Sequence, residues 1–160
     1  MTILKPTNSP KLICAISYVY LPEVLTAKKV GDVSIVVALK GINQWKPIYS
    51  TPGTITYNEK QTRTPEGILY SKELSIIYPD VNPAVSGSFA QLENSPCLVR
   101  FAFADGTYML IGDLSYPVIL SLDFKSDSKS VFTAVFLNKS PERALFYYPT
   151  VESVQLPPLD

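Results

Sequence analysis

Apolar and polar residues alternate clearly in the second half of the chain. Residues 97–113, CLVRFAFADGTYMLIGD, hold two alternating runs that meet at Asp105 and Gly106. An Asp-Gly pair between such runs predicts a tight antiparallel hairpin with a type I′ turn, because both central residues of that turn take positive φ. With these two as the loop residues, Phe101 is expected opposite Leu110.

Apolar runs of strand length recur on both sides of this hairpin. After it, the pattern predicts a meander that continues through strands at 118–124 and 131–137, with a turn at 126–128 between them. The nearly all-apolar run 33–39 predicts a central strand covered on both faces. Further strands are expected at 12–20, 54–57, 68–70 and 74–78.

Many short strands with frequent turns predict a single β domain over residues 1–160, built as an antiparallel β-sandwich or a small barrel. One short helical turn is expected at Phe89 to Glu93, because Ser88 can cap it and Gln91 follows three residues later. Pro96 then ends the helix. The expected fold class is therefore mainly β with one short helix.

Both ends of the chain are rich in proline. Residues 1–11 and 149–160 cannot continue a helix or a central strand, so we expect them to form extended arms. Apolar side chains on these arms would dock onto the domain itself or onto a neighbouring subunit, and both alternatives stay open. The candidate contact residues are Ile3, Leu4, Val151, Val154, Leu156 and Leu159.

Charge and composition exclude several kinds of function. The 160 residues include 14 basic and 14 acidic side chains, so no net charge attracts nucleic acid or an anionic membrane. The apolar run 12–21 is too short to span a bilayer, which argues against a membrane segment. Histidine is absent, which excludes histidine-based catalytic triads and metal sites. No catalytic, cofactor or metal-binding residue is assigned, and the sequence predicts a protein that is not an enzyme.

The two cysteines each stand in an apolar run. Cys14 lies in KLICAISY and Cys97 in SPCLVRF, and no neighbouring residue would lower the pKa of either thiol. We interpret both as buried core residues with reduced thiols, which is typical of intracellular proteins. A disulfide between them remains an alternative if their strands adjoin.

Acidic and aromatic residues provide two further candidate sites. Close carboxylates bind cations or act as acid and base, but aspartate is also favoured at turns, where its side chain accepts backbone hydrogen bonds. We assign the turn role to Asp105, Asp113 and Asp127; Asp123 is the remaining aspartate of this region. Aromatic residues close in sequence can form a flat platform for a sugar ring, as in carbohydrate- or ligand-binding β-sandwich modules. The candidate platform is Trp45, Tyr49 and Tyr57.

One long segment resembles a known class of proteins. FAQLENSPCLVRFAFADGTYMLIGDLSYPVILSLDF, residues 89–124, is followed by SVFTAVFLNKSPERALFYY at 130–148. The order of helical turn, strand, D-G turn, L-I-G motif, proline-led strand and final strand is similar to small virion proteins of tailed phages, particularly those of Bacteroidetes and crAss-like type. The resemblance covers Phe89 to Tyr148.

The resemblance implies a structural subunit of the head-to-tail connector or tail. Its expected partners are copies of itself in a ring and neighbouring virion proteins, and its expected location is the virion after assembly in the host cytoplasm. A purely cytoplasmic location is the alternative. The resemblance implies no catalytic residue, and the apolar arms agree with it, because head-to-tail contacts close a ring when the rotation between subunits fits.

Overall fold

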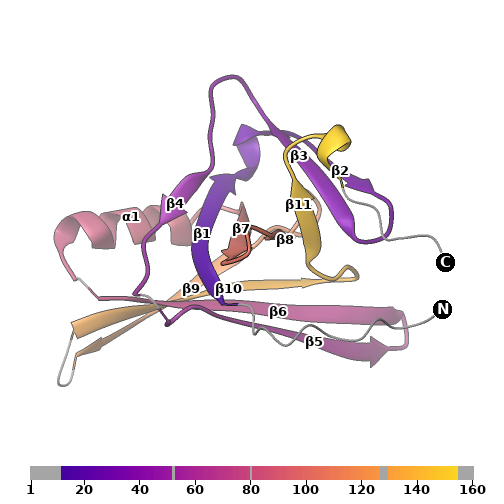
Figure 1. Cartoon of the computed structure of the whole chain (residues 1–160). Coiled ribbons are helices and arrows are strands. Elements are labelled where there is room, and N and C mark those ends of the chain that lie inside the picture. The colour runs from indigo at the N-terminus through magenta and orange to yellow at the C-terminus, as the bar shows by residue number, and fades with distance from the viewer. Residues whose placement is uncertain (1–11, 52, 80, 127–129, 155–160) are drawn as a thin grey trace.

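The computed structural model describes residues 12–51, 53–79, 81–126 and 130–154. Over these residues the chain is mainly β, with two sheets stacked as layers and one α-helix at the side (Figure 1). The predicted fold class is confirmed as a sandwich, since neither sheet closes into a barrel within the described residues.

The larger sheet has seven strands in the order β2-β3-β11-β8-β7-β1-β4. Their bounds are β1 Ile13–Tyr20, β2 Val24–Val30, β3 Ser34–Leu39, β4 Lys46–Ile48, β7 Cys97–Phe103, β8 Tyr108–Ile111 and β11 Leu145–Tyr148. The smaller sheet has the order β5-β6-β10-β9, with β5 Thr56–Thr64, β6 Gly67–Tyr78, β9 Ile119–Ser126 and β10 Ser130–Ser140. The helices are α1 Pro83–Glu93 and the short 3-10 turns η1 Leu21–Glu23 and η2 Val151–Ser153.

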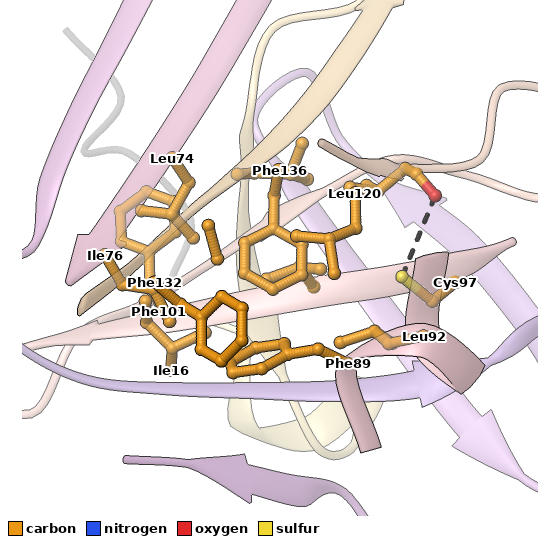
Figure 2. Close-up of a cluster of buried hydrophobic side chains, with 14 residues drawn as sticks. Ile16, Leu74, Ile76, Phe89, Leu92, Cys97, Phe101, Leu120, Phe132 and Phe136 are labelled. Atoms are coloured by element: carbon orange, nitrogen blue, oxygen red, sulfur yellow. Dashed lines mark hydrogen bonds between the residues drawn. The ribbon is translucent and has the colours of Figure 1, made fainter. Parts of the chain in front are cut away.

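The main hydrophobic core lies between the two sheets (Figure 2). Inward-facing side chains of β1, β7 and β8 meet those of β6, β9 and β10, and α1 adds Phe89 and Leu92. Phe101 and Phe136 are completely buried there. Burial of each large apolar side chain contributes about 1.5–3 kcal/mol, so this layer holds the two sheets together.

A second apolar cluster lies on the opposite face of the larger sheet. Leu98 and Leu110 belong to it and alternate along β7 and β8 with residues of the main core. The sheet curls over this cluster. Trp45, just before β4, and Tyr147 of β11 have ring centroids 5.6 Å apart, although β8, β7 and β1 lie between these two strands in the sheet. The guanidinium of Arg100 lies 4.7 Å from the first ring and 5.0 Å from the second.

The Asp-Gly hairpin is present, but its predicted turn type and register are wrong. The backbone N–H of Gly106 donates to the Phe103 oxygen over 3.0 Å, and only the glycine of this loop has positive φ, at 89°. The loop therefore has three residues, 104–106, in which a type I turn is followed by a left-handed glycine. Asp105 is not in the left-handed region, and Phe101 faces Met109 instead of Leu110. This shift of one residue places Phe101 and Met109 together on the face toward the main core.

The predicted meander is also wrong. After β8 the chain crosses from the larger sheet to the smaller one, where β9 and β10 pair, and β11 then returns to lie between β8 and β3. The pairing of β11 with β3 is parallel. Strands β2, β4 and β11 were not predicted, and the runs at 68–70 and 74–78 form the single strand β6. The predicted turn at 126–128 falls largely outside the described residues.

Two other details differ from the sequence-based expectations. The helix begins at Pro83, because the side chain of Asn82 accepts the backbone N–H of Val85 over 2.9 Å and caps it six residues before Ser88. Strand β3 is buried on both faces at residues 34–37 as predicted, but it lies next to the sheet edge instead of at the centre.

The two cysteines have different environments. Cys97 is completely buried, whereas Cys14 is exposed, so the prediction of two buried thiols is wrong for Cys14. The pairing of β1 with β7 shifts between Ile13 and Ala15, which places Cys14 at an irregularity that turns its side chain outward. Both thiols are free, and the alternative of a disulfide between them is excluded in this structure.

The terminal arms can be described only in part. Of the predicted contact residues, Ile3, Leu4, Leu156 and Leu159 lie outside the described residues. Val151 begins the 3-10 turn η2 and is 55% exposed, and Val154 is half-buried. The expectation of a fully extended arm over 149–160 is therefore wrong at residues 151–153.

Candidate functional site

A polar pocket of about 400 Å³ lies where the chain crosses from the larger sheet to the smaller one. Residues 112–116 of this crossover form one wall, and both sheets contribute to the lining. The charged lining residues are Lys29, Lys72, Asp113, Glu142 and Arg143. Apolar lining comes from Ala27, Ile35, Leu110 and Leu145. The pocket therefore combines an apolar wall with several charged groups.

Lys72 is the central charged group of this pocket. It extends from β6 toward the inside of the sandwich and is only 1% exposed. Its Nζ donates to Oδ1 of Asn138 over 2.9 Å and to Oγ of Ser140 over 2.7 Å. Burial lowers the pKa of Lys72, because charge is costly away from water, while the carboxylates of Glu59, Asp113 and Glu142 act in the opposite direction.

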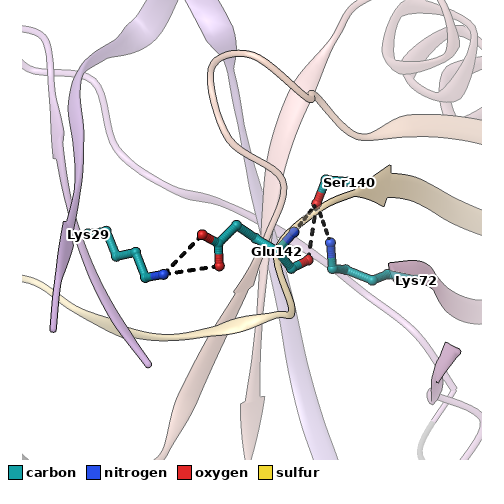
Figure 3. A network of polar contacts seen from close by, with 4 residues as sticks. All are labelled: Lys29, Lys72, Ser140 and Glu142. Carbon is teal, nitrogen blue, oxygen red and sulfur yellow. Dashed lines mark hydrogen bonds and ion pairs between the residues drawn. The ribbon is translucent and has the colours of Figure 1, made fainter. Parts of the chain in front are cut away.

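The contacts of Ser140 and Glu142 extend this network across the sandwich (Figure 3). Oγ of Ser140 accepts the backbone N–H of Glu142 over 3.3 Å, and the Glu142 carboxylate binds Nζ of Lys29 on β2 at 2.9 Å. A continuous chain of polar contacts thus joins β6 and β10 of the smaller sheet to β2 of the larger one. The ion pair is partly exposed, so its net stabilisation is at most about 1 kcal/mol.

The side chain of Asn138 binds the crossover that forms one wall of the pocket. Its side-chain amide donates to the backbone oxygens of Tyr116 and Pro117 at 2.8 and 3.2 Å. The carboxylate of Asp113 accepts the backbone N–H groups of Ser115 and Tyr116, both at 2.7 Å. These bonds hold the crossover in one conformation above Lys72.

Asp113 and Asp105 therefore have the turn role predicted for them. Asp105 accepts the backbone N–H of Thr107 over 2.9 Å. Asp127 lies outside the described residues. Among the described residues, no group of three or more acidic or cysteine side chains is arranged to hold a metal ion.

A second feature is the outer face of the smaller sheet. Apolar residues of β6, β9 and β10 that alternate with the core residues point away from the sandwich, and the other described elements lie on the opposite side of this sheet (Figure 1). Ile119 is 60% exposed and lies directly opposite Leu137, which is 37% exposed. Val135 continues the stripe along β10, and Ile77 on β6 is also exposed on this face, opposite Thr133.

The three aromatic residues of the predicted ligand platform lie in three different environments. Trp45 packs against Tyr147 in the second apolar cluster. Tyr57 packs against Phe101 at 4.8 Å in the main core, where burial and the nearby Glu59 raise the pKa of its hydroxyl. Tyr49 is 60% exposed beside Tyr78 and lines a separate hollow next to α1. The contacts of Trp45 and Tyr57 are those of packing residues.

Sequence reasoning did not identify Lys72 as a site residue. Lys72, Leu74 and Ile76 stand at alternate positions of one strand, and the last two are buried in the main core. This period of two predicts that Lys72 shares the inward face. The signal became readable only once 68–70 and 74–78 were known to form one strand.

Comparisons with known proteins gave no match: no protein-family model, curated protein or solved structure matches this chain. In the described part of the chain, the structure contains no helix with the length and apolar character needed to cross a bilayer.

Proposed function

We propose that the protein is a structural subunit that acts through contacts with copies of itself and with neighbouring proteins. The observation that carries this proposal is the apolar stripe formed by Ile119, Leu137 and Val135 on the outer face of the smaller sheet. Contiguous exposed apolar surface on a soluble protein usually marks an interaction site. Burial of each such side chain by a neighbour would contribute about 1.5–3 kcal/mol.

Charged residues beside the stripe favour a specific contact over non-specific hydrophobic association. Glu73 lies opposite Leu137 on one side, and Asp123 lies opposite Thr133 on the other. Charges at the edge of an apolar patch restrict which partner surface fits, because an unpaired charge resists burial. The face therefore has an apolar centre with a polar border.

A ring requires a second, different surface that receives the first. We propose that the terminal segments supply it, with Val151, Val154 and the apolar residues of 1–11 and 155–160 as contact groups. Together with the resemblance over Phe89 to Tyr148, this favours a connector or tail subunit of a tailed-phage virion. Heterologous contacts of this kind close into a ring when the rotation between subunits fits.

The experiment is a measurement of particle mass in solution for the wild type and two variants. Ile119→Asp places a charge in the stripe, and Ile42→Asp is its matched control, since Ile42 is 97% exposed in the loop before β4. We expect the wild type and Ile42→Asp to form the same multimer and Ile119→Asp to remain a folded monomer, with folding checked by circular dichroism. A wild type that stays monomeric, or an Ile119→Asp multimer of unchanged mass, would overturn the proposal.

A further inference from the structure

Lys72 is a buried cation whose two contacts are with neutral groups. Asn138 and Ser140 accept two of its hydrogens, and an ammonium has three. Among the contacts of the described residues, no carboxylate forms a hydrogen bond or an ion pair with it; Glu59, Asp113 and Glu142 act only through their charge. One N–H and one positive charge are therefore left without a partner in contact, although the side chain is 1% exposed.

The other charged groups of the pocket already have partners. Asp113 accepts two backbone N–H groups of its own turn, and Glu142 pairs with Lys29. The guanidinium of Arg143, which also lines the pocket, lies over the ring of Tyr70 at 5.3 Å from the ring centroid. Lys72 is thus the cation of the lining that has neither a carboxylate nor an aromatic ring in contact.

We propose that this pocket binds a small carboxylate ligand with a short apolar chain. One carboxylate oxygen accepts the remaining N–H of Lys72, and the apolar chain packs against Leu110 and Leu145. A monoanion fits better than a phosphate, because one ammonium offers one charge, whereas phosphate sites usually provide several donors. A volume of about 400 Å³ is within the range of small-molecule sites.

This inference does not depend on the proposed assembly, since the residues that line the pocket do not include Ile119, Leu137 or Val135 of the apolar stripe. The competing occupant is water, which would also satisfy the third N–H of Lys72. Water gives no saturable response to a carboxylate. A titration with a carboxylate therefore distinguishes a carboxylate site from a pocket that holds only water.

The test is a titration of the full chain with sodium butyrate, followed by amide resonances in NMR. Ionic strength is held constant with sodium chloride, and butyramide serves as the neutral control of the same shape. We expect saturable shifts at Gly112, Asp113 and Ser140 with butyrate and none with butyramide. Lys72→Met should weaken binding at least tenfold, while Lys60→Met, at an exposed lysine of β5, should leave it unchanged.

A second measurement keeps the test decisive if Lys72→Met does not fold. In wild-type protein labelled with ¹⁵N-lysine, butyrate should shift the Nζ resonance of Lys72 with the same dissociation constant as the amides. Equal effects of butyrate and butyramide, shifts that do not saturate, or an unchanged Lys72 Nζ resonance would each overturn the proposal.

Discussion

Lys72 of β6 and Asn138 of β10 are direct cross-strand partners, and the lysine Nζ donates to the asparagine side-chain oxygen over 2.9 Å. The amide of the same asparagine holds two backbone oxygens of the crossover between the sheets. One side chain thus connects the buried charge to the loop that covers it. The buried ammonium and the crossover that forms one wall of the pocket are therefore held by the same residue.

Asn138→Ala is expected to destabilise the fold by about 2–4 kcal/mol, because it removes one acceptor and two donated hydrogen bonds at a buried position. Asn43→Ala is the matched control. Its amide donates to the Lys40 oxygen over 2.7 Å but is exposed, so its removal should cost less than about 1 kcal/mol. Urea unfolding measures both, and equal losses would contradict the central role of Asn138.

The stability of the protein relative to Lys72→Met is expected to rise with pH. Burial lowers the pKa of Lys72 from its usual 10.5, so above the folded-state pKa the unfolded chain binds more protons than the folded one. The desolvation cost of the ammonium is complete below that pKa and disappears as the pH approaches about 10.5. Urea unfolding at several pH values gives the free energy of unfolding of the wild type minus that of Lys72→Met. If this difference stays constant or falls as the pH rises, burial does not destabilise the charged form of Lys72.

Alanine substitutions at Gly112 and Gly106 test how tightly the crossover and the hairpin turn are packed. Both have φ near 90°, so alanine at either position should cost about 1–2 kcal/mol for backbone strain. A Cβ at Gly112 would also lie 2.8 Å from Cγ2 of Val118, whereas nothing lies within 4 Å of one at Gly106. We expect Gly112→Ala to lower the thermal midpoint clearly more than Gly106→Ala, and the reverse order would be inconsistent with the packing of the crossover.

The two thiols are expected to react at very different rates. Cys14 is exposed, while burial raises the pKa of Cys97 to about 12, and its Sγ lies 3.7 Å from the Val118 oxygen. At pH 8 a thiol reagent such as Ellman's should modify one cysteine rapidly and the second only after denaturation. Cys14→Ser should abolish the fast phase; rapid reaction of two thiols in the folded wild type would contradict the burial of Cys97.

The sequence predicted the class of fold because strand periodicity and turn residues are local signals. It failed where a choice depended on distant contacts. An Asp-Gly pair suits both a two-residue and a three-residue hairpin loop, and the position of Phe101 and Met109 on the core face decides between them. Likewise, Cys14 stands in an apolar run, but a local irregularity in the pairing of β1 turns it outward.

The candidate site was harder to predict than the fold. Lys72 shares the inward face of β6 with Leu74 and Ile76, but this period appears only when 68–70 and 74–78 are joined into one strand, and the partners Asn138 and Ser140 that accept its hydrogens lie on a strand distant in sequence. The aromatic residues Trp45 and Tyr57 suggested a platform, and the structure uses both for packing. The fold thus places Trp45 and Tyr57, which are close in sequence, in different apolar clusters. It brings Lys72 into contact with Asn138 and Ser140, which lie more than sixty positions away.

The central claim is that the outer face of the smaller sheet is a contact surface. The most direct test is the labelling rate of a cysteine in the variant Ser121→Cys, made in a Cys14→Ser background. Ser121 is exposed on this face of β9, opposite Val135, and Glu66→Cys in the exposed turn between β5 and β6 is the matched control. We expect maleimide labelling at position 121 to be at least tenfold slower in the assembled protein than in the dissociated subunit, with no change at position 66. Equal labelling at position 121 in both states would contradict the account.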